Sequence, residues 1–370
     1  MPLELRSWIN HQPYTNSYST SGIAREASYF TTVPEPVTVD PEYVTAEARE
    51  YEAAGYDSST VPQSATWPDV AATAAWALAA TSRLSLVLAH RPGVQAPTAA
   101  ARAIATLDRL SDGRTSVHLI LGHGDLTRDG DFLDREERYA RAAEYLDVFT
   151  GVLTRTEPFD YEGRYYRVEG AFSGVRPVQS PRPVLSIPGG SELGVDLAAR
   201  YADVVAFRGQ PLEAVGAAVA QARTIAATHG RDPGFWVNLN MVVGETDEAA
   251  WDHVRRLEDA VRTLIAYRGD GRSEVTSIRE HRKGFFDADV PDVVDTALYL
   301  GLQRLGGGEA TLVGSPSTIA DAVLAYEDLG VSIITLGSHV TDPRDAELRA
   351  ETLRLIKRAV AARDAVRAAA

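Results

Sequence analysis

Short apolar runs and longer amphipathic runs alternate along most of this chain. A short apolar run bounded by turn residues is typical of a buried strand, and apolar positions that recur every three or four residues are typical of a helix. The pattern predicts eight strands, over residues 3–9, 56–61, 84–89, 115–121, 183–187, 203–207, 235–243 and 331–336. It predicts helices over 41–54, 68–80, 134–153, 193–200, 212–228, 247–266 and 316–329, with others that begin at Pro97 and near Pro343.

Each predicted strand is followed by a helix, which makes neighbouring strands parallel. Eight such units predict a (β/α)₈ TIM barrel, with a doubly wound open sheet as the alternative. No stretch rich in proline, glycine and serine divides the chain, so we expect one domain over 1–370. Three segments fall outside the alternation and are interpreted as insertions: 11–40, 155–180 with a β-hairpin at 159–168, and 267–309.

Composition narrows the function. The formal net charge of −14 over 370 residues argues against nucleic acid or an anionic membrane as a partner. The absence of cysteine excludes disulfides and thiolate catalysis, and it fits a cytoplasmic location. No signal peptide or membrane-length apolar run is found. The eight histidines are scattered without metal-ligand spacing, so no metal site is expected.

The predicted strand ends carry many side chains that can form hydrogen bonds. In a barrel the loops after the strands share one face, so residues far apart in the sequence can converge there. Taken singly, a histidine or arginine on a loop is more often just solvated, and for Asn238 and Asn240 a binding role and a solvent-facing position on a strand end are equally good explanations. The candidates are His11, Trp67, His90, Arg91, His123, Asp125, Gly189 to Glu192, Arg208, Asn238, Asn240 and His339.

The run Pro188-Gly189-Gly190-Ser191 joins a predicted strand to a predicted helix. Two glycines let backbone N–H groups approach an anion, and the amino end of a helix favours negative charge. The run therefore predicts a phosphate site, with a plain glycine turn capped by Ser191 as the alternative. Tyr139 either points its phenol at the same phosphate or packs in the core.

Several of these segments together resemble the bacterial-luciferase-like superfamily, in particular its FMNH₂-dependent alkanesulfonate monooxygenase branch. The resemblance extends from about Leu3 to the last helix, and its most specific part is 97–139. The matching segments are Arg91-Pro92, Pro97-Thr98, Arg102, 105–111, 113–114, 129–130, 132–134, 137–139, 161–163, 189–191, 245–249 and 312–314.

This resemblance implies a barrel that takes FMN as FMNH₂ from a separate NAD(P)H:flavin reductase and activates O₂ as a flavin peroxide. It also implies a homodimer or homotetramer. Tyr139, Ser191 and the amides of Gly189 and Gly190 correspond to contacts with the FMN phosphate, and we add His123 as a cofactor contact. Arg304 matches an arginine on the family's mobile loop, where 306–308 would be the hinge. His11 matches a histidine at the end of the first strand.

Four positions depart from the alkanesulfonate branch. Trp67, Asn238, Asn240 and His339 stand where that branch has cysteine, arginine, histidine and tyrosine. Losing an arginine removes an anion clamp, so we expect a substrate other than a simple alkanesulfonate, neutral or bulkier. Trp67 and Asn238 are expected to line the substrate pocket. His11, Arg304, His339 and Asn240 are the expected catalytic set.

Two alternatives remain open at this point. One is an F420-dependent oxidoreductase of the same superfamily, which transfers hydride without activating oxygen. The other is a non-catalytic flavin-binding barrel.

Overall fold

Eight parallel strands close into a barrel in the computed structural model, which describes residues 3–10, 27, 39–121, 126–267, 291–306, 308–337 and 343–369. The ring closes because the longest strand, β9, pairs with β8 on one side and with β13 on the other. The predicted (β/α)₈ barrel is confirmed. Its strands are β1 (Glu4–Trp8), β2 (Ser58–Val61), β3 (Ser85–His90), β4 (Thr115–Leu119), β7 (Leu185–Pro188), β8 (Val204–Arg208), β9 (Gly234–Val243) and β13 (Ile333–Gly337).

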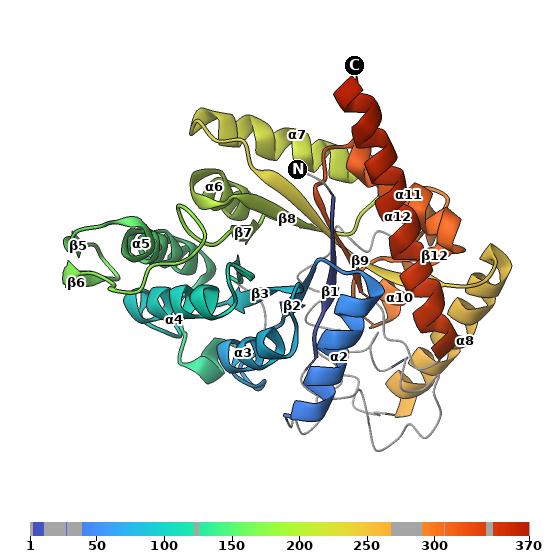
Figure 1. Ribbon diagram of the computed structural model, residues 1–370, viewed down its shortest axis with the longest axis horizontal. Helices are drawn as coiled ribbons and strands as arrows, with labels where there is room; N and C mark the ends of the chain where they lie inside the picture. Colours follow the sequence, from blue (N-terminus) through green and yellow to red (C-terminus); the bar gives the residue numbers. More distant parts are fainter. Residues whose placement is uncertain are drawn as a thin grey trace.

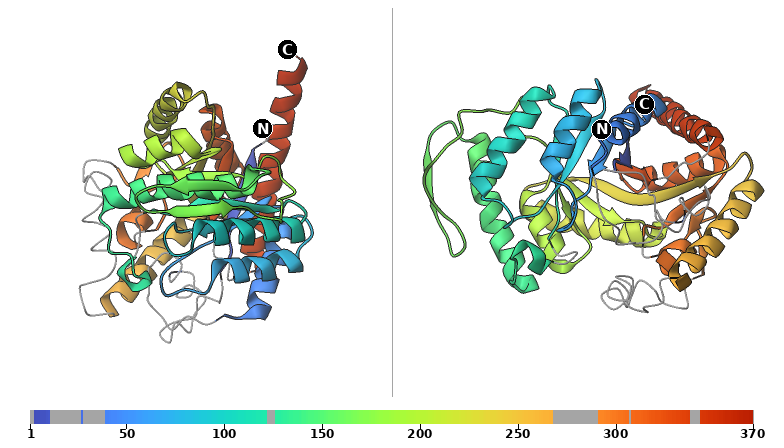
Figure 2. Two further views of the ribbon diagram at one scale, coloured as in Figure 1. Left: turned by 90° about the vertical axis from the view of Figure 1, so that its left-hand side faces the viewer. Right: turned by 90° about the horizontal axis from the view of Figure 1, so that it is seen from below.

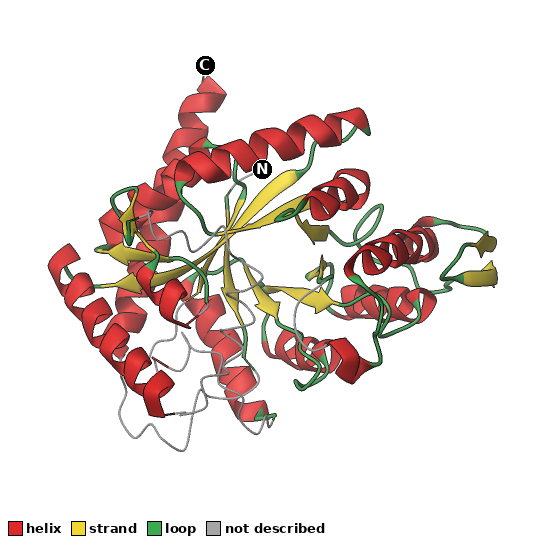
Figure 3. Cartoon of the chain, turned by 180° about the vertical axis from the view of Figure 1, so that it is seen from behind, coloured by secondary structure: helices red, strands yellow, loops and turns green. Residues whose placement is uncertain are grey.

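Helices surround the strands in chain order (Figures 1 and 3). Local chemistry sets several of their ends: Asp40 caps the first amides of α2, and Gly55 ends that helix with a φ of 103°. The outer helices are α2 (Pro41–Ala54), α3 (Val70–Ala80), α4 (Pro97–Leu110), α5 (Arg135–Thr154), α6 (Glu192–Tyr201), α7 (Leu212–Thr228), α8 (Asp247–Tyr267), α11 (Pro316–Asp328) and α12 (Pro343–Ala369). The last turns of α12 project beyond the body on the side where β1 begins (Figure 2).

The structure contains three strands that the sequence did not predict. Strand β12 (Thr311–Gly314) pairs in parallel with the carboxyl half of β9, and the short strands β10 (Val293–Val294) and β11 (Leu298–Tyr299) continue this extension. Most of the remainder of the expected 267–309 insertion, and nearly all of the 11–40 insertion, lie outside the described residues. Between β11 and β12 lies the short helix α10 (Gly301–Gly306). The predicted hairpin is confirmed as antiparallel β5 (Phe159–Glu162) and β6 (Arg167–Ala171), beside α5.

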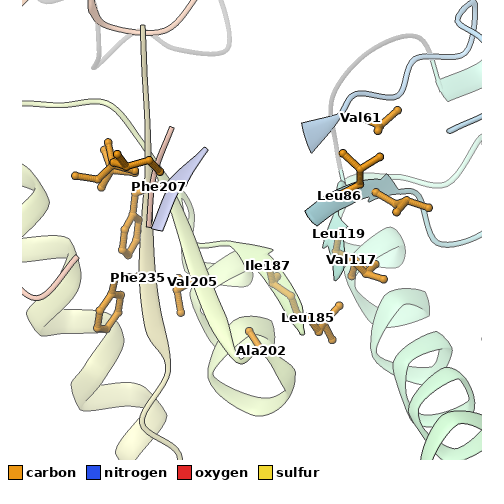
Figure 4. Packing of buried hydrophobic residues seen from close by; sticks show 14 of the residues in the cluster. Val61, Leu86, Val117, Leu119, Leu185, Ile187, Ala202, Val205, Phe207 and Phe235 are labelled. Carbon is orange, nitrogen blue, oxygen red and sulfur yellow. The ribbon is translucent and has the colours of Figure 1, made fainter. Parts of the chain in front are cut away.

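Most buried apolar side chains lie between the barrel and its helices. Figure 4 shows part of this layer, in which the rings of Phe207 and Phe235 stack with their centres 6.1 Å apart. These outward-facing residues alternate with inward-facing ones along each strand, as the pleat requires. The core therefore holds the helices against the barrel, and the alternate side chains of each strand point into the barrel interior.

The interior of the barrel is closed by a plug of large side chains. The guanidinium of Arg6 lies 4.2 Å from the ring centre of Trp236, whose indole N–H donates to Thr335 Oγ1 at 2.8 Å. His118 meets the same indole edge-on at 4.7 Å, and burial together with the Arg6 charge lowers the pKa of His118 to about 3. This histidine is therefore neutral, and the centre of the barrel is packed, which leaves its ends for ligands.

A buried carboxyl group fixes the carboxyl end of β1. Glu47 of α2 accepts hydrogen bonds from the backbone N–H of Asn10 at 2.5 Å and from its side-chain amide at 3.0 Å, and from the hydroxyls of Tyr43 and Tyr51. Burial raises the pKa of Glu47 to about 7, although these hydrogen bonds oppose the shift.

We expect Glu47 to make folding stability depend on pH. The folded protein holds a proton on Glu47 that the unfolded chain releases at lower pH, so stability falls as pH rises from about 4.5 to about 7. The decline from this group is at most about 3 kcal/mol. Urea unfolding of wild type and of Glu47→Gln at pH 5 and pH 7.5 measures it. If both proteins lose the same free energy between these pH values, Glu47 is not responsible.

Candidate functional site

The structure brings the predicted phosphate turn and its predicted phenol together. Ser191 caps α6, where its Oγ accepts the N–H of Gly194 at 3.2 Å. The hydroxyl of Tyr139, which comes from α5, lies 3.4 Å from the same Oγ. Two hydroxyls from segments 52 residues apart thus meet at the carboxyl end of β7.

The backbone amides around this pair differ in what they can bind. The N–H of Gly189 donates to the carbonyl of Ala206 on β8 at 2.8 Å, so the expectation that this amide holds a phosphate is wrong. Among the described residues, the N–H groups of Gly190, Ser191, Glu192 and Leu193 have no acceptor. These four amides, at the amino end of a helix, form the part of the turn that can receive an anion.

Gly189 has a packing role in place of the predicted binding role. A Cβ atom there would lie 2.5 Å from Val205 Cγ1 and 2.8 Å from Phe207 Cε1. At Gly190 a Cβ atom would meet nothing within 4 Å. The sequence alone does not distinguish the two adjacent glycines. The structure shows that Gly189 is packed against β8 and that Gly190 borders open space.

A second polar group lies on the next two strands, at the end of β8 and in the middle of β9. Arg208 pairs with Glu309 at 2.8 Å, and its Nη2 also donates to the carbonyl of Gly308 at 3.0 Å. Asn238 stands directly opposite Arg208 in the register of β8 and β9. The buried side chain of Asn240 donates to the carbonyl of Glu309 at 3.4 Å.

Glu309 was missed by the sequence analysis. It is the last residue of the expected 267–309 insertion, with no motif around it. Strand β12 explains its position, because the N–H of Asn240 donates to the carbonyl of Ala310 at 2.8 Å and so fixes the preceding residues beside the barrel mouth. No local signal in the sequence marks it, because β12 has only four residues and its pairing depends on how far β9 extends.

Trp67, His90 and Arg91 line one pocket beside α3, and the other remaining candidates lie elsewhere. Trp67 lies in the loop before α3, is 40% exposed, and lines a pocket of 410 Å³ with Arg91 and Asp129, which pair at 2.7 Å. The ring of His90 is bonded to Tyr145 Oη at 2.6 Å, and burial lowers the pKa of His90 to about 4. Arg304 of α10 is paired with Asp292. His11, His123, Asp125 and His339 lie outside the described residues.

Comparison with known proteins supports the fold and identifies relatives. The model of the family "Luciferase-like monooxygenase" matches residues 21–332. A riboflavin lyase solved with modified FMN and riboflavin has a TM-score of 0.73 and 18% identity, over 97% of this chain and 92% of that one. EDTA monooxygenase from Chelativorans sp. BNC1 has a TM-score of 0.71 and 17% identity, over 98% of this chain and 95% of that one.

Similar structures also include an F420-dependent enzyme. A secondary alcohol dehydrogenase solved with an F420–acetone adduct has a TM-score of 0.68 and 15% identity, over 96% of this chain and 99% of that one. At such identities the likeness shows a shared fold. Within the described part of the chain, no helix has the length and apolarity of a membrane span, and no cluster of ligands suited to a metal ion is found.

The two glycines of the turn give a direct test of their different roles. We expect Gly189→Ala to destabilise the protein by about 1–3 kcal/mol, because the new methyl group overlaps the side chains of Val205 and Phe207. Gly190→Ala should change stability by less than about 1 kcal/mol, since its Cβ meets open space. Urea unfolding measures both. Equal destabilisation would show that crowding by β8 does not explain Gly189.

Proposed function

Because this chain belongs to the luciferase-like monooxygenase family, we propose that it is a two-component monooxygenase that uses FMNH₂ and O₂ to oxidise a small organic substrate other than a simple alkanesulfonate. One observation supports a cofactor that has a phosphate group: the hydroxyls of Tyr139 and Ser191 lie together at the amino end of α6. The family match carries the choice of oxygen chemistry. FMNH₂ would come from a separate reductase.

The turn fits the phosphate of FMN. Four unbonded amides and two hydroxyls supply several donors, and the helix end adds a favourable dipole. A phosphate accepts from all of these groups without requiring a positively charged side chain. Ser191 has a lone pair occupied by the N–H of Gly194, and this contact aims its hydroxyl proton away from the helix.

Bound FMNH₂ would supply the two electrons that reduce O₂, with one oxygen atom entering the substrate and the other leaving as water. The protein's part is to exclude bulk water and to supply protons at the mouth. The packed plug of Arg6, Trp236 and His118 closes the barrel from below. The neutral His118 has a pKa of about 3, so it supplies no proton near neutral pH.

Arg304 is proposed to act at the mouth. Its side chain is paired with Asp292 at the start of β10, on the extension that follows α8. To act on a substrate, Arg304 would leave Asp292 and would stabilise the negative charge that develops during the reaction. His11, which matches the family, and His339, which departs from it, remain the proposed acid–base residues, and Asn240 remains a proposed orienting residue.

F420 is the alternative cofactor, because F420-dependent enzymes share this fold. Oxygen consumption separates the two hypotheses, since hydride transfer to or from F420 uses no O₂. The purified protein should consume O₂ when FMNH₂ and a panel of substrates are supplied, and should bind FMN more tightly than F420. Tight F420 binding without oxygen uptake would reverse the assignment. FMN binding without substrate-dependent oxygen uptake would favour a non-catalytic barrel.

The phosphate assignment is tested by removing its hydroxyls. We expect Tyr139→Phe and Ser191→Ala each to weaken FMN binding about tenfold, because each loses one hydrogen bond to a charged group. Ser191→Ala should also lower stability by about 1 kcal/mol through loss of the helix cap. FMN titration followed by fluorescence quenching measures the affinity. Riboflavin, which has no phosphate, is the control ligand, and its affinity should not change.

The role of Arg304 is tested by truncation. Arg304→Ala should reduce substrate oxidation at least about a hundredfold while FMN affinity stays within a factor of two, since the proposed contact forms only during the reaction. Asp292→Asn, which removes the carboxylate charge beside Arg304 and keeps the arginine, is the matched variant and should retain oxidation. Undiminished turnover in Arg304→Ala would remove this arginine from the mechanism.

A further inference from the structure

The end of β8, the middle of β9 and the segment before β12 together carry a group of four residues that the turn after β7 does not use. We call Arg208, Asn238, Asn240 and Glu309 the mouth cluster. We propose that the mouth cluster selects a neutral substrate with an amide-type edge, such as a carboxamide, lactam or urea, in which N–H and C=O groups lie side by side. This inference rests on the proposed function, since it names the substrate class of that same site.

The orientation of the mouth cluster follows from strand register. Trp236, Ala206 and Val204 form an interior group, so residues that continue the same alternation toward the carboxyl ends also face inward. Arg208, Asn238 and Asn240 are those residues on β8 and β9. Within the other barrel strands, the last residues of this alternation are Trp8, Thr60, Ala89, His118, Pro188 and Gly337. None of them is charged, because the pKa of His118 is about 3. Arg91 follows one residue beyond β3 and is paired with Asp129.

The cluster offers no net charge to a ligand. Arg208 is the single cation among these inward-facing strand-end residues, and the carboxylate of Glu309 lies 2.8 Å from it. Their side chains are 31% and 21% exposed, so each charge is partly shielded from water and depends on the other. An anionic substrate would be repelled by Glu309 or would have to replace it beside Arg208. A cationic substrate would be repelled by Arg208 or would have to replace it beside Glu309. A neutral substrate leaves the pair intact.

Three buried atoms of the cluster have no hydrogen-bond partner among the residues that the structure describes. They are one donor, Arg208 Nε, and two acceptors, Asn238 Oδ1 and Glu309 Oε2. The bond from Asn238 Nδ2 to the carbonyl of Phe207, at 3.4 Å, orients the carboxamide so that its oxygen is the unbonded end. Leaving such atoms unpaired is costly, so a ligand that pairs with them gains affinity.

An amide edge is the complement of these three atoms. Its N–H groups can donate to Asn238 Oδ1 and Glu309 Oε2, and its carbonyl can accept from Arg208 Nε. An ester lacks the N–H donors, and a carboxylate adds a negative charge beside Glu309. Because the three atoms are covered in the present arrangement, engaging them requires the half-buried side chains of Arg208 and Glu309 to turn toward the mouth.

The test uses three probes that share a ring and differ in head group: benzamide, methyl benzoate and benzoate. Their binding to the FMN-loaded protein is measured by calorimetry. Wild type should bind benzamide about tenfold or more tightly than either other probe. Glu309→Gln leaves Arg208 without its counter-charge, so the ratio of benzoate to benzamide affinity should rise at least about tenfold. Glu169→Gln, at the exposed Arg167–Glu169 pair, is the matched control and should not change the ratio.

A second variant keeps the test decisive if Glu309→Gln fails to fold. Asn238→Leu removes Oδ1 with little change of volume, and should weaken benzamide about tenfold while leaving benzoate unchanged. Wild type that binds benzoate as tightly as benzamide, or binds no benzamide, would overturn the inference. So would a Glu309→Gln protein with weaker FMN binding and an unchanged probe ranking, because the cluster would then contact the flavin.

The same samples separate this inference from the proposed function. Oxygen uptake with FMNH₂ and FMN affinity are measured beside probe binding. If wild type neither binds FMN nor consumes O₂, yet its flavin-free form ranks the probes as expected, the proposed function fails and the selectivity stands. If FMN binding and oxygen uptake are present but the ranking is not, the selectivity fails and the proposed function stands.

Discussion

The length of β9 is the constraint on which the barrel mouth depends. This strand has ten residues, whereas the other barrel strands have four to six. Its amino half closes the barrel against β8 and β13, and its carboxyl half extends past them with a free edge that β12 occupies. Because an unpaired buried edge is costly, the extension recruits β12 and places residues 308–310 beside Arg208. One overlong strand thus supplies two asparagines and positions Glu309.

The sequence predicted the elements whose signals are local. Apolar periodicity and helix caps located the eight barrel strands and the outer helices, and the barrel itself predicted that residues after different strands would share a face. The meeting of Tyr139 and Ser191 follows from that logic and from the family resemblance. Glu309 could not be predicted, because β12 has four residues and its pairing depends on how far β9 extends. The donation from Gly189 to Ala206 could not be predicted either, since it is a contact between strands.

The two arginines that face the interior differ in what surrounds them. Arg6 is almost fully buried, stacks on Trp236 and pairs with Glu4, so its charge is committed to the plug. Arg208 lies one layer nearer the mouth and is a third exposed on its side chain. The buried charge of Arg6 is part of the packed interior, whereas the partly exposed charge of Arg208 can interact with a molecule that enters the barrel mouth. The position along the strand therefore separates an arginine of the scaffold from one that can meet a substrate.

The order of strands also decides how an anionic cofactor tail and a neutral substrate can share one mouth. The proposed phosphate turn follows β7, the mouth cluster lies mainly on β8 and β9, and these three strands are consecutive neighbours. Strands about 5 Å apart place the two groups about 5–10 Å from one another across the rim. At that distance an uncompensated Arg208 would attract the phosphate as well as any anionic substrate. Pairing Arg208 with Glu309 removes this competition and leaves the proposed anion site to the backbone amides after β7.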